Sequence, residues 1–337
     1  MTKRSTQFPT AIPTGPLQTI QEKTAQSIVE QQGNPLAAFF RKSKLSLTLP
    51  SHGKWYPKNS LTYDTNGKLP VFAMNASDDI KFRTGDATMT GQNIYVVIKS
   101  CVPNINQPNV IPHIDIDSIL LAIRVASYGP DFDFSVSVPN TTLVRTIKLD
   151  ANQLLTEIAS RQDKWDEDIT IEDETGQTLS LVVYPIQLEQ LFIASKNIFM
   201  LRRTLSKNFD KDENIKDEAS FSTSMNNLTT SAIDLLCSSI KKLVLTSPTG
   251  NILLTLDADN PQDAAQIKQT IHQLDIEYFN AIRDHIDIQR KKYVFLSPEQ
   301  KSTDKEIEAG APETWVAELT FMGSNFLPEP KNINGIM

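Results

Sequence analysis

The sequence predicts an α+β protein: an irregular mix of β-hairpins and helices, with an extended N-terminal arm and a helical C-terminal region. Turn signals between apolar runs, such as Asp64–Thr65–Asn66–Gly67, predict hairpins. Apolar residues spaced as on one helical face, closed by Gly129 and Pro130, predict a helix over 115–129. Hairpins and helices follow one another without a repeat of fixed length, which favours a mixed fold over a solenoid.

Composition places the chain among ordinary globular proteins. It has 337 residues, of which 39% are hydrophobic and 22% are charged, enough for about two domains with normal cores. Acidic residues outnumber basic ones by 40 to 33, giving a net charge of −7, which argues against a nucleic-acid binder as a whole. No stretch approaches the ~18 consecutive apolar residues of a membrane span. The first 16 residues are polar and Pro-rich, unlike a secretory signal, so we expect a protein made in the cytoplasm.

The pattern of apolar and polar stretches divides the chain into five parts. We expect an N-terminal arm at 1–42 that is disordered or orders on a partner, and a first domain at 43–207. An acidic polar linker is expected at 208–224, a C-terminal helix-hairpin-helix region at 225–330 and a tail at 331–337. The two folded regions could also fuse into one body.

Within the first region, strands and helices alternate. The predicted strands are 45–49, 69–74, 132–138, 143–149, 169–172 and 179–184. Asp150, with Gln153 three residues later, predicts a capped helix through Ile158, and Pro185 predicts the start of another helix through Phe199.

The second region has the same kinds of signal. A helix is expected from about Met225 through Ile240, then a hairpin formed by 243–245 and 252–256. Asn260 and Pro261 mark the start of one long helix, whose apolar stripe runs from Ile267 to Ile286. A final strand is expected at 315–321.

The residues that carry chemistry are scattered. Of the four histidines, none lies four residues from another, and Cys101 and Cys237 are expected to be reduced thiols, although one disulfide between them is formally possible. Asp78–Asp79 and the pair Asp115 and Asp117 could hold a metal or act in acid–base catalysis. Asp115 and Asp117 lie at a predicted helix start and Asp78–Asp79 precede a polar turn, so we favour capping for both pairs. The sequence therefore predicts no catalytic residue, no metal site and no cofactor.

Four aromatic residues are the candidate contacts with other proteins. Trp55 and Tyr56 lie in a loop rich in Gly and Pro, and Trp315 and Phe326 lie near the C-terminus. Aromatic side chains bury a large area at little entropic cost, which suits interface anchors. The alternative interpretation is that they close the edges of this chain's own core.

Four blocks of sequence, in this order and spacing, resemble a known family. They are Lys54–Trp55–Tyr56–Pro57, FAMNASDDIKFRTGDATMTGQN from Phe72, SCVPNI from Ser100 and DIDSILLAIRVASYG from Asp115. Together they resemble the baseplate proteins of T4-like contractile phages, a family of baseplate hub or hub-assembly proteins. The resemblance implies a structural protein of the phage tail, and it extends faintly through the helices that follow Pro185 and Pro261.

The chain departs from that family at one point that bears on metals. Many members carry Cys-Pro-x-Cys after the strand that matches 131–137, a motif suited to a small zinc knuckle. Here the matching residues are Val138–Pro139–Asn140–Thr141, and a second cysteine pair expected around 315–321 is also missing. We therefore expect no zinc in this chain, with hairpin packing in its place.

The resemblance and the residues lead to one expected function. We expect a non-enzymatic component of the virion, in the contractile tail baseplate and in or next to its central hub. Its expected partners are other tail proteins in a symmetric, multi-subunit assembly, with no nucleic acid and no small-molecule substrate. The alternatives are a hub assembly factor absent from the mature virion, a cytoplasmic scaffolding or adaptor protein, and a metal-dependent hydrolase using Asp115 and Asp117.

Overall fold

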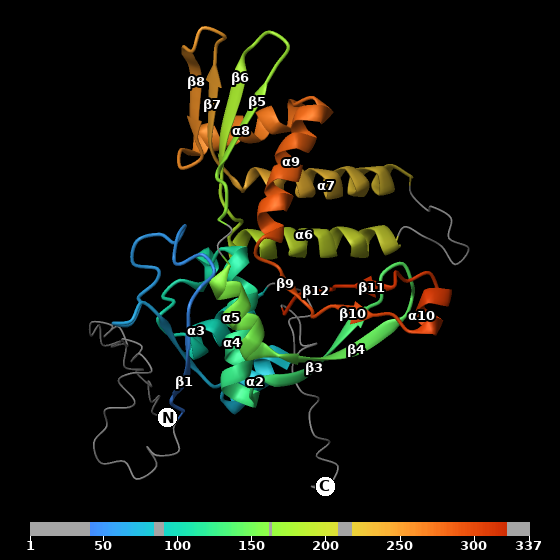
Figure 1. Cartoon of the computed structure of the whole chain (residues 1–337). Coiled ribbons are helices and arrows are strands. Elements are labelled where there is room, and N and C mark those ends of the chain that lie inside the picture. Colours follow the sequence, from blue (N-terminus) through green and yellow to red (C-terminus); the bar gives the residue numbers. More distant parts are fainter. Residues whose placement is uncertain (1–40, 84–90, 162–163, 208–217, 322–337) are drawn as a thin grey trace, which may run out of the picture. The chain divides into compact units, whose positions relative to one another are not determined.

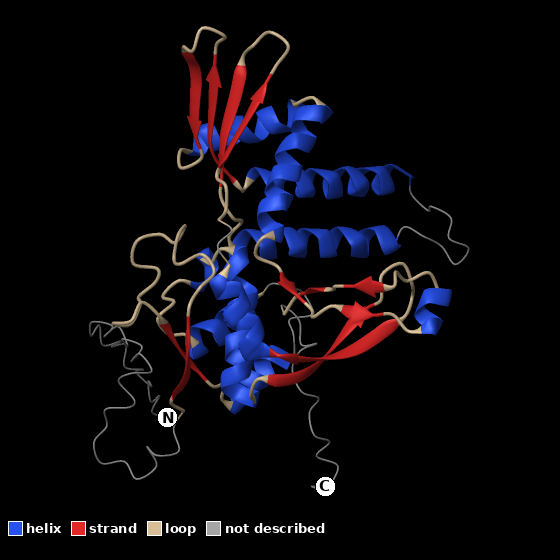
Figure 2. Ribbon diagram, viewed as in Figure 1, coloured by secondary structure: helices blue, strands red, loops and turns tan. Residues whose placement is uncertain are grey.

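The structure is a computed structural model that describes residues 41–83, 91–161, 164–207 and 218–321. These residues all belong to one compact unit, Arg41–Met337. They form helices and small antiparallel sheets, so the predicted α+β class is confirmed (Figures 1 and 2). Residues 1–40 of the arm expected at 1–42 lie outside the described residues, as does Phe326.

Helix α4 lies at the centre of the larger of two hydrophobic clusters. Its residues Ile119, Leu120, Leu121 and Ile123 are all buried, because apolar side chains follow one another on nearly every side of this helix. In chain order, the elements of this part are β1 (Ser43–Leu47), β2 (Leu69–Phe72), α2 (Ala76–Arg83), α3 (Gln92–Cys101), the 3₁₀ helix η2 (Pro108–Val110), α4 (His113–Tyr128), β3 (Asp131–Ser137), β4 (Val144–Asp150) and α5 (Ala151–Ser160).

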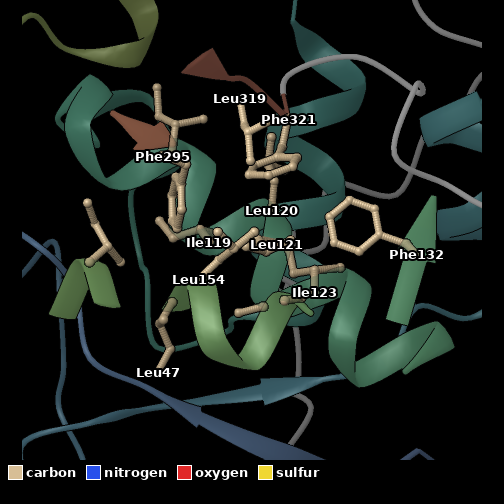
Figure 3. Close-up of a cluster of buried hydrophobic side chains, with 14 of the residues drawn as sticks. Leu47, Ile119, Leu120, Leu121, Ile123, Phe132, Leu154, Phe295, Leu319 and Phe321 are labelled. Carbon is tan, nitrogen blue, oxygen red and sulfur yellow. The ribbon is translucent and has the colours of Figure 1, made fainter. Parts of the chain in front are cut away.

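The C-terminal segment completes the same cluster. Figure 3 shows Phe295, Leu319 and Phe321 from this segment close to Ile119 and Leu120 of α4. The strand expected at 315–321 is interrupted, because β11 and β12 pair with different partners, β10 and β9. The elements of the segment are β9 (Phe295–Leu296), β10 (Gln300–Lys301), α10 (Asp304–Glu308), β11 (Thr314–Trp315) and β12 (Glu318–Leu319).

The second hydrophobic cluster lies on one face of a four-stranded antiparallel sheet in the order β5-β6-β7-β8. Alternate residues such as Leu181, Leu243 and Leu256 face that cluster, as a strand period of two requires. The elements here are β5 (Asp168–Glu172), β6 (Thr178–Val183), α6 (Leu188–Lys207), α7 (Glu218–Cys237), β7 (Ile240–Thr246), β8 (Ile252–Asp257), α8 (Pro261–Gln273) and α9 (Ile276–Lys291).

The pairing of β6 with β7 joins strands from both sides of the stretch expected to be a linker. Helix α7 begins at Glu218, inside the expected linker, and α6 packs along it. The boundaries of the domains stay a prediction.

The prediction of one long helix after Pro261 is wrong, because the chain forms α8 and α9 with a break between them. Leu274 has extended backbone angles (φ −61°, ψ 147°), and the Asp275 carboxylate accepts a hydrogen bond of 3.2 Å from the Glu277 amide. Asp275 therefore caps a new helix. The expected caps at Asp150 and Asn260 are confirmed, since each side chain accepts from the amide two residues later.

Candidate interaction site

The residues 50–57, here named the Trp55 loop, are held by a buried carboxylate. Asp115 is fully buried on α4, and its Oδ1 accepts a hydrogen bond of 2.9 Å from the Ser51 amide. Its Oδ2 accepts from the Ser51 hydroxyl and, at 3.0 Å, from the Tyr56 hydroxyl. One carboxylate thus fixes both ends of the loop.

The prediction that Asp115 and Asp117 cap their helix is wrong. Helix α4 begins earlier, after Pro112, where the His113 amide donates to the Ile186 carbonyl at 2.8 Å. This bond satisfies one amide of the first turn, which leaves the carboxylates for tertiary contacts. Asp117 accepts from the Phe321 amide at 2.7 Å, and burial raises the pKa of both carboxyls to about 6.

Asp78, by contrast, takes part in capping as expected. Its amide donates to the Asn75 side chain at 2.8 Å, and its carboxylate accepts from the Asn75 amide at 3.1 Å. The same carboxylate also binds the Arg41 guanidinium at 2.9 Å, and Arg41 donates to the Ser100 carbonyl at 2.8 Å. Arg41, near the end of the expected arm, is therefore tied to α2 and α3.

The backbone of the Trp55 loop has an unusual conformation. His52, Gly53 and Trp55 all have positive φ angles, of 51°, 78° and 67°. Non-glycine residues seldom adopt this region, and such strain concentrates at functional sites. A Cβ atom at Gly53 would lie 2.4 Å from the Tyr63 hydroxyl, so only glycine fits there. The loop thus has one enforced shape.

The side chain of Trp55 connects this loop to residues on either side of the β5–β6 hairpin. Its indole N–H donates to Glu167 Oε1 at 2.7 Å, and the Lys54 ammonium lies 2.7 Å from the same oxygen. The Trp55 ring packs edge-on against Trp165, with 6.1 Å between centroids, and lies 6.3 Å from the Tyr184 ring. The indole is half-buried, so one part of it remains open to solvent.

The other predicted anchors have different surroundings. Tyr56 is half-buried, and burial beside Asp115 raises the pKa of its hydroxyl well above the usual value. Trp315 is only 5% exposed and lies in the chain's own core, with the Arg145 guanidinium 5.4 Å from its ring centroid. For Trp315 the structure matches the alternative interpretation given above, and contact with other proteins stays a prediction for all four residues.

A groove with a volume of about 960 Å³ runs between the Trp55 loop and a second segment of the chain. Among the described residues that line it are the aromatic side chains Trp55, Trp165 and Tyr293, the cations Lys54, Arg161 and Lys164, and His52. Trp165 is buried, and its indole N–H donates to the Val183 carbonyl at 2.8 Å. Sequence reasoning missed Arg161, Lys164, Trp165 and Tyr293; the one available signal was a tryptophan in a polar stretch before a strand.

The β3–β4 hairpin contains Val138–Thr141, the residues at which the family resemblance implied a cysteine motif. Its turn is closed by hydrogen bonds, from the Val138 amide to the Leu143 carbonyl at 2.9 Å and from the Thr141 amide to the Val138 carbonyl at 3.2 Å. Arg145 joins the hairpin to the C-terminal segment through an ion pair with Glu306 and a 2.9 Å bond to the Lys301 carbonyl. Hydrogen bonds and an ion pair thus link the β3–β4 hairpin to the C-terminal segment.

The thiols and the most buried histidine have surroundings that disfavour reactivity. Burial next to Asp78 raises the pKa of the Cys101 thiol to about 12, and burial raises that of Cys237 to about 11. Burial also lowers the pKa of His113 to about 4. Both cysteines are free, and within the described residues no three His, Cys, Asp or Glu side chains gather as a metal site. None of the helices seen in the described ranges is long and apolar enough to span a bilayer.

Taken together, these features define a protein with a rigid aromatic loop and an adjacent groove lined by cations on an α+β body. Residues 44–252, more than half of the chain, match the family described as T4 bacteriophage base plate protein. The chain therefore belongs to this family, as the four sequence blocks predicted. The match covers the Trp55 loop and most of the groove but ends before Tyr293. No curated protein and no solved structure gives a significant match.

Proposed function

We propose that this chain is a structural component of the contractile tail baseplate, located in or next to the central hub, that acts by contacts and not by catalysis. The observation that carries the proposal is the family match over residues 44–252. The family match indicates a phage baseplate protein. The more specific position at the hub rests on the resemblance of the four sequence blocks.

The geometry of the Trp55 loop supports a contact role. The loop has a fixed conformation without a partner. The buried Asp115 carboxylate binds its Ser51 amide, two of its non-glycine residues have positive φ angles, and Gly53 packs closely against Tyr63. A preformed loop loses little conformational entropy on binding, which favours stable subunit contacts. Most protein oligomers have closed symmetry, and we therefore propose that each particle contains several copies of this chain in a symmetric arrangement.

Quantitative mass spectrometry of purified virions tests the proposal. A structural component should be present at a fixed ratio to another tail protein after the particles have been washed in high salt. A soluble host protein serves as the control for contamination. Presence in infected cells together with absence from virions would contradict the proposal and favour the hub assembly factor instead.

A further inference from the structure

We propose that the groove beside the Trp55 loop binds an extended acidic segment of a neighbouring tail protein. This inference rests on the proposed function, because it assumes that the chain contacts other subunits. It adds the place of contact and the chemistry of the partner.

The first argument is the excess of positive charge in the groove. Among the residues that the structure describes, Lys54, Arg161 and Lys164 line the groove and no acidic residue does, although the whole chain has a net charge of −7. Lys54 already pairs with Glu167. Within the described residues, the Lys164 ammonium and the His52 ring form no hydrogen bond or ion pair, which leaves these groups open to an incoming anion.

Arg161 gives the second argument. Its Nη1 donates to the Lys292 carbonyl at 2.9 Å and to the Val294 carbonyl at 2.8 Å, so the guanidinium is fixed in place. Among the residues that the structure describes, no carboxylate pairs with it, and its Nε and Nη2 make no hydrogen bond. A half-buried, oriented guanidinium with free N–H groups is suited to a carboxylate, which it can bind with two parallel hydrogen bonds.

The aromatic walls give the third argument. Trp55, Trp165 and Tyr293 are held by hydrogen bonds, including one of 3.0 Å from the Trp165 amide to the Tyr293 hydroxyl. Rigid aromatic surfaces can contact the backbone and apolar stems of a peptide at little entropic cost. The volume of about 960 Å³ is at the upper end of ordinary ligand pockets, which extend over roughly 300–1,000 Å³, so it suits a few peptide residues.

A peptide fits these observations better than a nucleic acid. Binding along a phosphate backbone requires many cations in a continuous stripe. In the described part of the chain the groove has three lysine and arginine side chains, one of them already paired, and the protein is acidic as a whole. A short run of Asp or Glu residues matches the small number of cations that line the groove.

Fluorescence anisotropy with the full chain tests the inference. The probe is a fluorescein-labelled dodecapeptide of alternating Asp and Gly residues, titrated in low and in high salt. We expect binding that weakens in high salt, a loss of about tenfold for Arg161→Gln, and a loss of about threefold for Lys164→Gln. Lys68→Gln removes an exposed lysine that does not line the groove and is the matched control; it should leave binding unchanged.

Three results would overturn the inference. They are the absence of binding by the wild-type chain, equal binding after Lys164→Gln, and tighter binding of a single-stranded oligonucleotide of the same formal charge. Lys164 is exposed, so its replacement tests the groove even if Arg161→Gln fails to fold. If the chain is present in virions but the peptide does not bind, only this inference fails. If the peptide binds but the chain is absent from virions, the proposed function fails instead.

Discussion

Asp115 connects the Trp55 loop to α4, and its ionisation should make the stability of the protein depend on pH in a defined direction. The carboxyl is fully buried, and burial raises its pKa from the ordinary value of 3.8 to about 6. The folded state therefore binds the proton more tightly than the unfolded state. The stabilisation from this group is present at low pH and is lost as the pH rises through about 6.

The magnitude follows from the difference between the two pKa values. A difference of about 2 units corresponds to about 3 kcal/mol in total, of which about 1.4 kcal/mol falls between pH 5 and pH 8. Asp115→Asn replaces the carboxyl with a neutral group of the same shape, which does not titrate. As the pH rises from 5 to 8, the unfolding free energy of the variant should therefore increase by about 1.4 kcal/mol relative to that of the wild type.

Urea unfolding followed by tryptophan fluorescence measures this difference at several pH values. Glu308→Gln, at an exposed position, gives the baseline for removing a carboxylate. The reasoning is refuted if the difference in unfolding free energy between Asp115→Asn and the wild type stays constant from pH 5 to pH 8. A gain in the opposite direction would show that the three hydrogen bonds outweigh burial.

Three further predictions concern the core, a close backbone approach and the arm. Ile123→Asp should unfold the first region because it places a charge on the apolar centre of α4, whereas Ile123→Val should cost only about 1 kcal/mol; circular dichroism checks both, and a native-like aspartate variant would show that this face is exposed. Gly91→Ala should destabilise the protein by about 2–4 kcal/mol in urea unfolding, because Gly91 has φ +68° and a Cβ would lie 2.2 Å from the Phe192 ring. Gly67→Ala, at φ +71° in open space, should cost only about 1 kcal/mol, and equal costs would contradict the packing argument. Deletion of residues 1–40, which retains Arg41, should change the melting temperature by less than about 2 °C while weakening incorporation into tails; a large loss of stability would contradict the arm prediction.

Local signals in the sequence were sufficient for most elements of the fold. Asp150 and Asn260 lie directly before helices and bind their first free amides, so their neighbours alone determine the caps. The same reasoning failed at Asp115 and Asp117, because their partners Ser51 and Phe321 are 64 and 204 residues away in the chain. A carboxylate near a helix start has the same local pattern in both cases.

The groove could not be predicted for the same physical reason. Its walls come from the Trp55 loop, from residues around Trp165 and from Tyr293, and only tertiary packing brings them together. The break between α8 and α9 was also missed, because the apolar stripe continues across Leu274 and hides the change of direction. Asp275, followed by a helical run, was the signal that could have revealed it.

A cryo-electron microscopy reconstruction of the purified baseplate tests the account most directly. The account predicts symmetric density that fits the body from Arg41 to Phe321, with the Trp55 loop touching a different protein. A well-resolved baseplate whose densities are all assigned to other chains would contradict it.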